Sequence, residues 1–510
     1  MAEKRDHRKA PLYERLIEYA GRERAGFHVP GHNSGAGAPW GAEERFRPIM
    51  EIDLTELPEL DDLHAAEGVI REAQTLAADA FGAGHTFFLV GGSTAGNLAM
   101  IMSLCGPGDL LIVQRDVHKS VIHGLMLARC RAVFLAPRID PATGLSLGVE
   151  ADRVEEALRR FPEAKGVLVT NPSYYGAASD LRPVVETAHA RGKPVLVDEA
   201  HGAHFAFHPD LPPSAMSCGA DAAVQSAHKM LNAMTMGAML HVQGDRLDRE
   251  RLGQLLAMVQ SSSPSYPIMA SLDLCRRDYA LRGEEQLSRA MAMIRDVRSR
   301  LAANGRFRAA ELPAGTGRVL DPFKMALHDS LGQLNGYRMA EELSRRGIAV
   351  EMADPRYALL VLNASTPRSH LERLEEALRQ LEEAFPAGPP AQGRGSDSGE
   401  ERAAVAASLS LSAGLGAAFA AEPISDPVSF LPPAETAAAG TRTARIPVEQ
   451  CAGRISAEMI IPYPPGIPLL YRGECIHPAA RDALLRLGQA RARVQGASDA
   501  ELRTILVYDL

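Results

Sequence analysis

The side chain best suited to covalent chemistry is that of Lys229, in the segment Ser226-Ala227-His228-Lys229. This segment follows Ala222 to Gln225, a short run typical of a buried strand, so Lys229 is expected near a strand end. A lysine amine placed there, beside a hydroxyl and an imidazole, can form a Schiff base with a carbonyl when its ammonium is desolvated or repelled. A lysine by itself is more often a solvated surface residue, so a second group must support this interpretation.

The second group is Asp198, which ends the apolar run from Val195 and precedes Lys229 by 31 residues. A carboxylate at a strand end can pair with the ring nitrogen of pyridoxal phosphate and make the ring an electron sink. An isolated aspartate there is more often a helix or turn cap. The combination of a strand-end aspartate and a strand-end lysine favours a pyridoxal phosphate enzyme.

A glycine-rich segment, Gly91 to Asn97, could hold the phosphate of such a cofactor. It reads Gly-Gly-Ser-Thr-Ala-Gly-Asn, follows an expected strand at Thr86 to Val90 and opens an expected helix. Glycines let the backbone approach an anion, hydroxyls donate to it, and a helix N-terminus offers free N–H groups. The segment matches neither the dinucleotide-binding nor the nucleotide P-loop pattern, which argues against both.

Two further strand ends carry polar groups suited to a planar cofactor. His118 follows an expected strand at Leu110 to Val113, and its ring could stack on the cofactor. The segment from Thr170 to Gly176 follows an expected strand at Val167 to Thr170. A histidine in such a place is often only the first residue of a helix. These two segments therefore support a pyridoxal phosphate site only in combination with Lys229 and Asp198.

These segments need a sheet to position them, and the pattern from Gly68 to Val242 predicts one. Short apolar runs bounded by turns alternate with helical patterns, which is typical of a mostly parallel sheet covered by helices. Ligands of such sheets bind at the carboxyl ends of the strands. The fold class expected is therefore α/β, with a large sheet domain, a small α+β domain and a C-terminal α+β domain.

Changes in pattern and composition divide the chain into five parts. An N-terminal segment is expected over 1–65, with a short helix after Pro11, and the major domain over 66–305, ending in a long helical segment from Arg251 to Asn304. A small α+β domain is expected over 306–386. A flexible linker rich in Pro, Gly, Ser and Ala is expected over 387–441, and the C-terminal domain over 442–510.

Composition restricts the partners and the compartment. The net charge is −8, with 46% hydrophobic and 23% charged residues, which argues against nucleic acid or an anionic membrane as the main partner. No window resembles a secretory signal or a membrane span. The six cysteines show no CxxC spacing. Buried, reduced thiols in a cytoplasmic protein are therefore expected, and no metal site is predicted.

The sequence resembles the Orn/Lys/Arg decarboxylase family of fold type I pyridoxal phosphate enzymes, in its shorter bacterial form. Besides the lysine segment and the glycine-rich loop, the resemblance is carried by Phe27–His32, Asp53–Leu57, Ser261–Tyr266, and Tyr463–Pro468 with Gly473-Glu474. It covers nearly the whole chain except the expected linker. Two departures stand out: about 65 residues precede the first core helix, too few for the receiver-like domain of the large family members, and His201 occupies a position where many members have an aromatic residue.

The resemblance implies roles for individual residues. Lys229 would bind the cofactor covalently, Asp198 would pair with its ring nitrogen, His118 would stack on its ring, and His228 would assist protonation beside the phosphate. The other cofactor-binding residues implied are Ser93, Thr94, Ala95, His201 and Ser226, with Ser262 and Ser263 contributed by a second subunit. The resemblance thus also implies a homodimer or higher homo-oligomer with shared active sites.

The reaction implied is decarboxylation of a basic L-amino acid, with arginine to agmatine in polyamine biosynthesis as the first choice. Lysine and ornithine are the alternative substrates, and an aminotransferase, an aldolase or a non-catalytic regulatory homologue are the alternative functions. A cationic side chain needs a facing carboxylate when it leaves water. Glu474 is expected to supply it, because the proline-rich turn before it would stiffen its backbone; Glu458 and the carboxylates of 53–62 are the alternatives.

Overall fold

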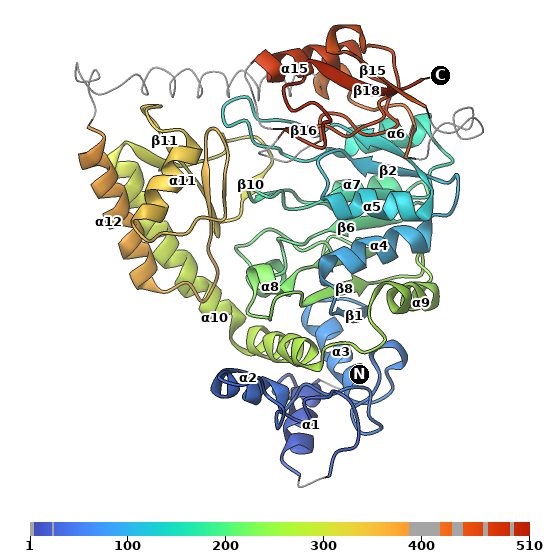
Figure 1. Cartoon of the computed structure of the whole chain (residues 1–510), viewed down its shortest axis with the longest axis vertical. Helices are drawn as coiled ribbons and strands as arrows, with labels where there is room; N and C mark the ends of the chain where they lie inside the picture. Colours follow the sequence, from blue (N-terminus) through green and yellow to red (C-terminus); the bar gives the residue numbers. More distant parts are fainter. Residues whose placement is uncertain are drawn as a thin grey trace.

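The computed structural model describes residues 5–22, 25–386, 419–430, 442–462, 468–489 and 494–509. Figure 1 shows an N-terminal segment at the bottom, a large α/β domain above it, a small domain at the left and a C-terminal domain at the top. Within these described ranges, no helix is long and apolar enough to cross a membrane.

The large domain is built on an eight-stranded sheet. Its strands are β1 (His85–Leu89), β2 (Leu110–Gln114), β3 (Arg131–Leu135), β4 (Val167–Thr170), β6 (Val195–Asp198), β7 (Ala222–Gln225), β8 (Ala238–Val242) and β14 (Val428–Ser429). Their order across the sheet is β1-β8-β7-β6-β4-β2-β3-β14. The strands from β7 to β3 pair in parallel, whereas β8 lies antiparallel between β1 and β7. The predicted mostly parallel sheet is confirmed, with β8 as an antiparallel insertion.

Helices cover both faces of this sheet, because alternate residues of each buried strand point to opposite sides. Leu111 and Val113 of β2 pack in one apolar cluster with α4, α5 and α9. Leu110 and Ile112 pack in another cluster with α6 and α7. The bounds of these helices are α4 (Gly92–Leu104), α5 (Lys119–Ala128), α6 (Ala151–Arg160), α7 (Arg182–His189) and α9 (Arg249–Val259).

A single helix of 39 residues, α10 (Tyr266–Asn304), connects the underside of the large domain to the small domain (Figure 1). The small domain contains β9 (Phe307–Ala309), β11 (Lys324–Asp329), α11 (Gly336–Arg345), β12 (Met352–Ala353), β13 (Ala358–Val361) and α12 (Arg368–Ala384). Its strands form an antiparallel sheet in the order β12-β13-β11-β9. Met325 and Leu327 of β11 pack in the core with α10, α11 and α12, which leaves Lys324 on the opposite face, toward the large domain.

The small domain also meets the large domain through a short strand pair and a polar contact. β5 (Ala177–Ala178) of the large domain pairs antiparallel with β10 (Val319–Leu320). Just after β10, Asp321 accepts a hydrogen bond from His204 at 3.1 Å, and both side chains are fully buried. The segment between β10 and β11 is therefore fixed against the loop that follows β6.

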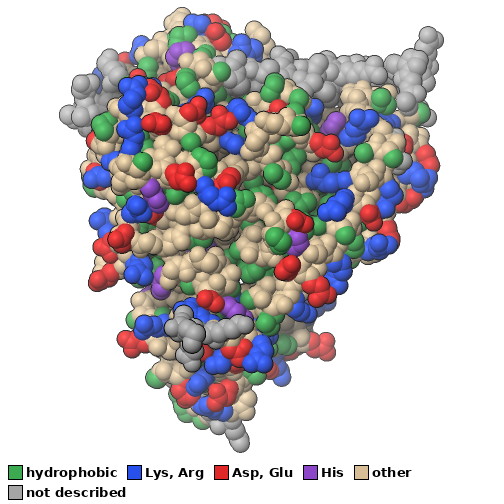
Figure 2. Space-filling view, turned by 180° about the vertical axis from the view of Figure 1, so that it is seen from behind, with side chains coloured by type: hydrophobic (Ala, Val, Ile, Leu, Met, Phe, Trp, Pro, Cys, Tyr) green, Lys and Arg blue, Asp and Glu red, His purple; other side chains and the backbone are tan. Residues whose placement is uncertain are grey.

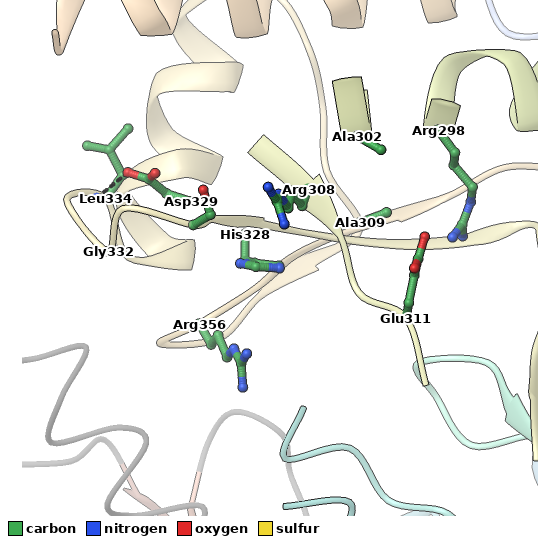
Figure 3. Close-up of a pocket in the computed structure, with 11 residues that line it drawn as sticks. Arg298, Ala302, Arg308, Ala309, Glu311, His328, Asp329, Gly332, Leu334 and Arg356 are labelled. Atoms are coloured by element: carbon green, nitrogen blue, oxygen red, sulfur yellow. Dashed lines mark hydrogen bonds between the residues drawn. The ribbon is translucent and has the colours of Figure 1, made fainter. Parts of the chain in front are cut away.

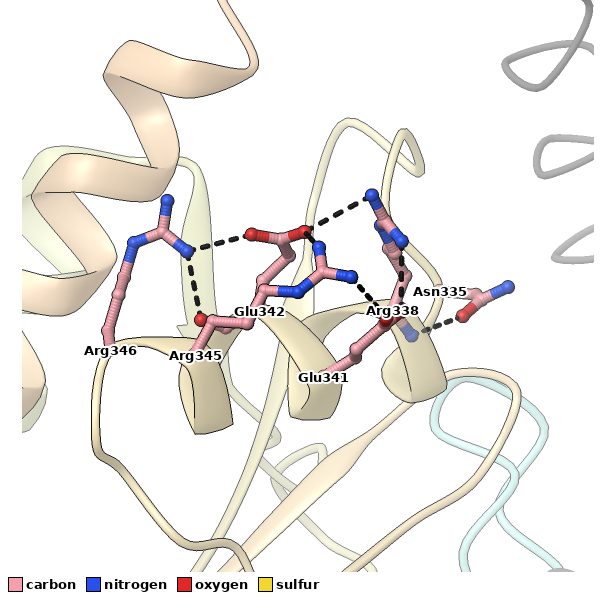
Figure 4. Close-up of polar contacts among 6 residues, drawn as sticks. All are labelled: Asn335, Arg338, Glu341, Glu342, Arg345 and Arg346. Atoms are coloured by element: carbon pink, nitrogen blue, oxygen red, sulfur yellow. Dashed lines mark hydrogen bonds and ion pairs between the residues drawn. The ribbon is translucent and has the colours of Figure 1, made fainter.

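Helix α11 is stabilised by polar contacts within a turn or two (Figure 4). The Asn335 side chain accepts from the backbone N–H of Arg338 at 2.8 Å and caps the helix. Glu342 accepts hydrogen bonds from Arg346, at 2.8 Å, and from Arg345, and it lies 3.1 Å from Arg338. One nearly buried carboxylate thus holds three guanidinium groups on the outer face of the small domain.

The N-terminal segment contains α1 (Pro11–Ala20), α2 (Glu43–Met50), the 3₁₀ helix η1 (Leu63–Ala65) and α3 (Val69–Ala80). A buried ion pair on α10 holds α1: Asp273 accepts from Arg276 at 2.6 Å and from the N–H of Leu12 at 3.0 Å. The expected helix after Pro11 is confirmed, whereas α2, which has no buried residue, was not predicted.

The C-terminal domain packs a helix against two antiparallel strand pairs. Its elements are β15 (Thr443–Pro447), η3 (Val448–Gln450), β16 (Ile461–Pro462), α15 (Pro478–Gln489), β17 (Val494–Gln495) and β18 (Thr504–Tyr508). Two other short helices among the described residues are η2 (Phe205–Phe207) and α8 (Ala227–Met230). The proline-rich turn expected to stiffen Glu474 lies at 463–467, outside the described residues.

The structure corrects the expected linker over residues 419–430. Here β14 pairs with β3 at the edge of the large sheet. The backbone N–H of Ser425 donates to the carbonyl oxygen of Phe134, and the Ser425 hydroxyl accepts from the backbone N–H of Phe134. Phe419 and Phe430 are buried. The prediction averaged composition over 387–441, so the short apolar segment within it was not recognised. Residues 387–418 and 431–441 lie outside the described ranges.

The cysteines carry no disulfide; five are buried, as predicted, and Cys475 is exposed. On the face shown in Figure 2, basic and acidic side chains are intermingled. That distribution fits the modest net charge of −8.

Candidate active site

The loops that follow β1, β2, β4, β6 and β7 leave the sheet at one edge, because these strands run in the same direction. They carry, in that order, the glycine-rich segment, His118, Tyr174, Asp198 and Lys229. The residues singled out at five separate strand ends therefore meet in one place.

Lys229 lies in the short helix α8, directly after β7, with Ser226 at the N-cap position. Its side chain is half-buried, and its Nζ lies 3.2 Å from Nε2 of His201. Burial lowers the pKa of Lys229, and the charges of Asp198 and Glu351 oppose that change. A lysine in this environment gives up its proton more readily than one in water, as a nucleophilic amine must.

Asp198 is the buried end of a chain of polar contacts that reaches the surface. Asn97, on α4, donates to Asp198 Oδ2 at 2.9 Å and is also 2.9 Å from Ser120 Oγ. The Ser120 hydroxyl contacts His118 Nδ1 at 2.8 Å, and the His118 ring is exposed. Burial by the surrounding loops lowers the pKa of His118, while the charge of Asp198 opposes this. The network fixes the carboxylate and the imidazole relative to each other.

The first turn of α4 and Ser226 form a candidate anion-binding corner. Helix α4 begins at Gly92, whose φ of +71° suits glycine, and no side chain caps its N-terminus. Ser93 and Thr94 lie in this first turn, and Ala95 is buried beneath it. Ser226 Oγ is buried and has no hydrogen-bond partner among the described residues. Free N–H groups and an unpartnered buried hydroxyl are suited to a phosphate.

His228 and the serines of the 261–263 segment have different surroundings. His228 is half-buried, its Nδ1 lies 3.1 Å from the carbonyl oxygen of Gly237, and burial lowers its pKa. Ser262 and Ser263 are exposed in the connection between α9 and α10. An exposed position leaves these two hydroxyls open to another molecule, and within this chain they contribute nothing to the edge that carries Lys229.

The structure corrects the expectation for Glu474. Its carboxylate accepts two hydrogen bonds from the Arg115 guanidinium, at 2.7 and 2.8 Å, and one from the backbone N–H of Tyr471. Both side chains are buried, and aromatic rings including Phe419 and Tyr471 surround Arg115. Because both carboxylate oxygens are engaged, Glu474 docks the C-terminal domain and does not face a substrate.

Three other acidic candidates, Glu458, Asp61 and Asp62, also have structural partners. Glu458 is buried and accepts backbone hydrogen bonds from Ser498 at 2.7 Å and Leu506 at 3.0 Å, which holds the C-terminal domain together. In the 53–62 segment, Asp61 accepts from the N–H groups that open α3, and Asp62 caps η1. The sequence identified the acidic residues but could not show which of them are bound to other groups of the protein.

Two family profiles match the chain: "Orn/Lys/Arg decarboxylase, major domain" over residues 10–313 and "Orn/Lys/Arg decarboxylase, C-terminal domain" over residues 419–494. The chain belongs to the Orn/Lys/Arg decarboxylase family. It is therefore an amino-acid decarboxylase, and the predicted family and fold class are confirmed. The second match begins at Phe419 and so includes β14, which pairs with β3 of the large sheet.

Individual members of the Orn/Lys/Arg decarboxylase family match over nearly the full length. The chain is 41% identical to "Uncharacterized protein YaaO" and 34% identical to "Arginine decarboxylase", both of Bacillus subtilis, and each alignment covers 98% of both proteins. The structure of the constitutive lysine decarboxylase of Escherichia coli matches with a TM-score of 0.77 at 22% identity, over 99% of this chain and 82% of that chain. At that identity the structural likeness shows the fold alone.

No role was predicted from the sequence for four residues that lie at this candidate site: Asn97, Ser120, Lys324 and Glu351. Asn97 ends the glycine-rich segment, and Lys324 directly precedes the apolar run 325–327, so both had a detectable signal. Glu351 accepts a hydrogen bond from the Tyr174 hydroxyl at 2.6 Å. Its charge, like that of Lys324, reaches the site only because the small domain packs beside the sheet, which no local pattern reveals.

A separate cavity of about 490 Å³ lies at the other end of β11, in the small domain (Figure 3). Arg298, Arg308, Arg356 and His328 line it together with Glu311. Arg308 and Arg356 each donate to a backbone carbonyl, at 3.0 and 2.8 Å. Since charges of both signs line this cavity and its arginines have protein partners, we assign it no ligand.

Proposed function

We propose that this protein is a pyridoxal phosphate-dependent arginine decarboxylase of the cytoplasm, which converts arginine to agmatine for polyamine biosynthesis. The observation that carries the proposal is the meeting of Lys229 and Asp198 at one sheet edge, in a chain of this decarboxylase family. The choice of arginine is supported by relatives named arginine decarboxylase from Bacillus subtilis and Bacillus anthracis, which are 34% identical over nearly the full length.

The residues at the sheet edge fit the cofactor. The uncapped first turn of α4, with Ser93, Thr94 and Ala95, and the unpartnered hydroxyl of Ser226 would hold the phosphate. Asp198 would hold the protonated ring nitrogen, and His118 would lie against the ring. When bound, pyridoxal phosphate supplies the conjugated ring that accepts the electron pair released as carbon dioxide leaves.

The chain's own groups prepare this chemistry. Asn97 and the backbone N–H of Ala200 hold the two oxygens of Asp198, so the carboxylate need not reorganise. Burial lowers the pKa of Lys229 and thus favours the free amine that binds the cofactor. Two imidazoles are proposed to move protons: His228, the residue before Lys229, and His201, whose Nε2 lies 3.2 Å from the Lys229 amine.

Glu351 is the carboxylate that we propose to face the cationic end of the substrate. It is exposed, its charge acts on both Lys229 and Lys324, and the hydroxyl of Tyr174 orients it. Unlike Glu474 and Glu458, it is not bound to a buried partner. A guanidinium offers a planar pair of donors, which suits a single oriented carboxylate better than a compact ammonium does.

The test is to incubate the purified, cofactor-loaded protein separately with arginine, lysine and ornithine and to identify the amine by mass spectrometry. Agmatine is expected, and Lys229→Ala should abolish both turnover and the visible absorbance of the bound cofactor. Cadaverine or putrescine as the main product would move the assignment to lysine or ornithine. No amine from any of the three, in protein that binds the cofactor, would contradict the decarboxylase proposal.

We also propose a homodimer in which Ser262 and Ser263 complete the partner's site. Both hydroxyls are exposed, and the N-terminal segment exposes large apolar side chains, among them Phe27 and Trp40 at 98% and 99% exposure. Light scattering should give about twice the monomer mass of 54.8 kDa. A Trp40→Asp variant should shift toward monomer, and a monomeric wild-type protein with full activity would exclude shared sites.

A further inference from the structure

Lys324 is a second buried lysine at the candidate active site. It is the first residue of β11, its side chain is 1% exposed, and its Nζ lies 5.7 Å from the centre of the Tyr174 ring. It comes from the small domain, whereas Lys229 comes from the large one. A buried ammonium is costly unless another group compensates it, so its partners indicate its purpose.

The partner common to both lysines is His201. Its Nδ1 lies 2.9 Å from Lys324 Nζ, and its Nε2 lies 3.2 Å from Lys229 Nζ. The ring is buried and packs edge-on against Tyr174, with 4.6 Å between ring centres. The imidazole therefore lies between two amines, with one ring nitrogen within hydrogen-bond distance of each.

Hydrogen bonding restricts the protonation states of this arrangement. An ammonium only donates, a neutral amine can accept, and a neutral imidazole has one N–H and one lone pair. When Lys324 is the ammonium, Nδ1 accepts from it and the Nε2–H donates to a neutral Lys229. When Lys229 is the ammonium, the opposite tautomer fits. Burial, and after it the charge of Lys324, lowers the pKa of His201 well below its usual value, which favours the neutral ring with a single N–H.

We propose that Lys324 is the proton partner of Lys229, and that His201 passes the proton between them. An N–H bond breaks at Lys229 Nζ as one forms at His201 Nε2, while the Nδ1–H bond breaks as one forms at Lys324 Nζ. One positive charge changes place, the imidazole changes tautomer, and the net charge stays the same. The step leaves Lys229 with a free lone pair, and its reversal returns the proton; Lys324 thus acts through His201 as a positioning residue.

The charges around the relay allow this exchange near neutral pH. Lys324 faces Asp321, Lys229 and Glu351 in addition to His201, and His201 also faces His118 and His204. Burial lowers the pKa of Lys324 to about 8, with the charge of Asp321 opposing and that of Lys229 assisting. The inference rests on the proposed role of Lys229 but not on the identity of the substrate.

The first test reads the amine of Lys229 directly, in full-length protein freed of cofactor. Trace acetylation across pH 6 to 10, followed by peptide mass spectrometry, gives the pH at which Lys229 becomes half reactive. Lys324→Met removes the proton acceptor and should raise this midpoint by about one pH unit, the coupling expected for strongly interacting sites. Lys193→Met removes a surface lysine bonded to the Pro162 carbonyl and should leave the midpoint unchanged.

His201→Phe keeps a ring beside Tyr174 but removes the bridge, so it should raise the Lys229 midpoint as Lys324→Met does. If the charge of Lys324 acted only through space, His201→Phe would keep the low midpoint and the relay would be excluded. An unchanged midpoint in Lys324→Met would overturn the proposal altogether. Because this readout needs no substrate, it stays informative even if arginine decarboxylation is not the activity.

Lys324→Arg provides the second variant, which keeps the charge but cannot give up its proton. We expect the pH at which Lys229 is half reactive to stay low, as in wild type. Turnover should nevertheless fall about 10²-fold at every pH between 6 and 9, which is the loss typical of a missing proton-transfer group. A merely structural lysine would tolerate arginine or lose folding, which circular dichroism would reveal. Turnover of folded Lys324→Arg within a few-fold of wild type would exclude the relay.

Discussion

Asp198 illustrates how much a single buried carboxylate depends on its neighbours. Its two oxygens accept from Asn97 and from the backbone of Ala200, and the carboxylate is 3% exposed. These two donors fix the carboxylate beside Lys229 and His118, with which its charge interacts. Under the proposed function, the fixed carboxylate would pair with the ring nitrogen of the cofactor.

Replacing Asp198 with Asn should keep the shape of this site and remove its charge. Losing one partner of a buried ion pair costs about 3–5 kcal/mol, so turnover should fall by roughly two to four orders of magnitude. Steady-state kinetics measures the loss, and cofactor absorbance should show that the phosphate corner still binds. Turnover within a few-fold of wild type would contradict the assigned role.

Glu351→Gln tests the carboxylate proposed to face the substrate. A hydrogen bond to a charged group contributes about 1.5–3 kcal/mol, so kcat/KM for arginine should fall about 10- to 100-fold while cofactor absorbance stays intact. Glu311→Gln, which changes another small-domain carboxylate away from the Lys229 edge, is the matched control. Equal kinetics for Glu351→Gln and wild type would direct the search to another acid, including one from a partner subunit.

At the residue scale, the sequence predicted the groups that lie at strand ends and missed those that depend on domain packing. Lys229 and Asp198 follow buried strands, so local pattern and spacing were enough to place them together. Glu351 and Lys324 belong to the small domain, and their contacts with Tyr174 and His201 arise only when the two domains meet. Glu474 was misassigned because its partner Arg115 is distant in sequence.

At the element scale, the Arg115–Glu474 pair fixes the C-terminal domain to the loop after β2. Glu474→Ala would leave a buried guanidinium without its carboxylate, which should lower the free energy of unfolding by about 3–5 kcal/mol. Urea unfolding followed by circular dichroism measures this, with exposed Glu449→Ala as the control. If both variants unfolded at the same urea concentration, the docking role of Glu474 would be wrong.

Helix α11 should give the small domain a specific sensitivity to acid. Burial raises the pKa of Glu342, but the hydrogen bond from Arg346 and the charges of Arg338 and Arg345 outweigh it, so the pKa falls below its ordinary value of 4.5. Because the folded-state pKa is the lower one, the stability from Glu342 is complete above pH 4.5 and is lost as the pH falls through the folded value.

Glu342→Gln should therefore be less stable than wild type at pH 7, by about 1 kcal/mol for this partly exposed network, and the difference should vanish in acid below the folded pKa. Thermal unfolding over a range of pH measures the difference between the two proteins. Glu372→Gln, on α12 and outside the α11 network, serves as the control. A difference that persisted undiminished at low pH would show that the stabilisation does not come from the charge.

The elements themselves were largely predictable, and the exceptions share a cause. The parallel strands of the large domain were predictable because each is a short, continuous apolar run bounded by turns and separated from the next by a helical pattern. The antiparallel direction of β8 could not be predicted, since strand direction follows from connections and not from composition. β14 has two residues, and its role is visible only through its partner β3.

At the scale of the whole molecule, the part of the chain after residue 419 is bound to the large domain by several separate contacts. β14 pairs with β3, Phe419 packs over Arg115, and Arg115 pairs with Glu474. A protease site inserted within 387–418 and then cut should leave both fragments in one particle on size exclusion, with turnover retained. Fragments that separate after cleavage would show that these contacts are too weak to hold the C-terminal domain.

The pairing of β14 with β3 also bears on how the protein is made. β3 emerges from the ribosome early, and until residues 428–429 follow, its outer edge offers unpaired backbone groups to any other extended chain. The nascent large domain therefore holds every strand that leads to the candidate site but stays open at one side until β14 is made. A truncated chain ending near residue 386 should carry that open edge permanently, so it should be prone to aggregation even though every strand that leads to the candidate site is present.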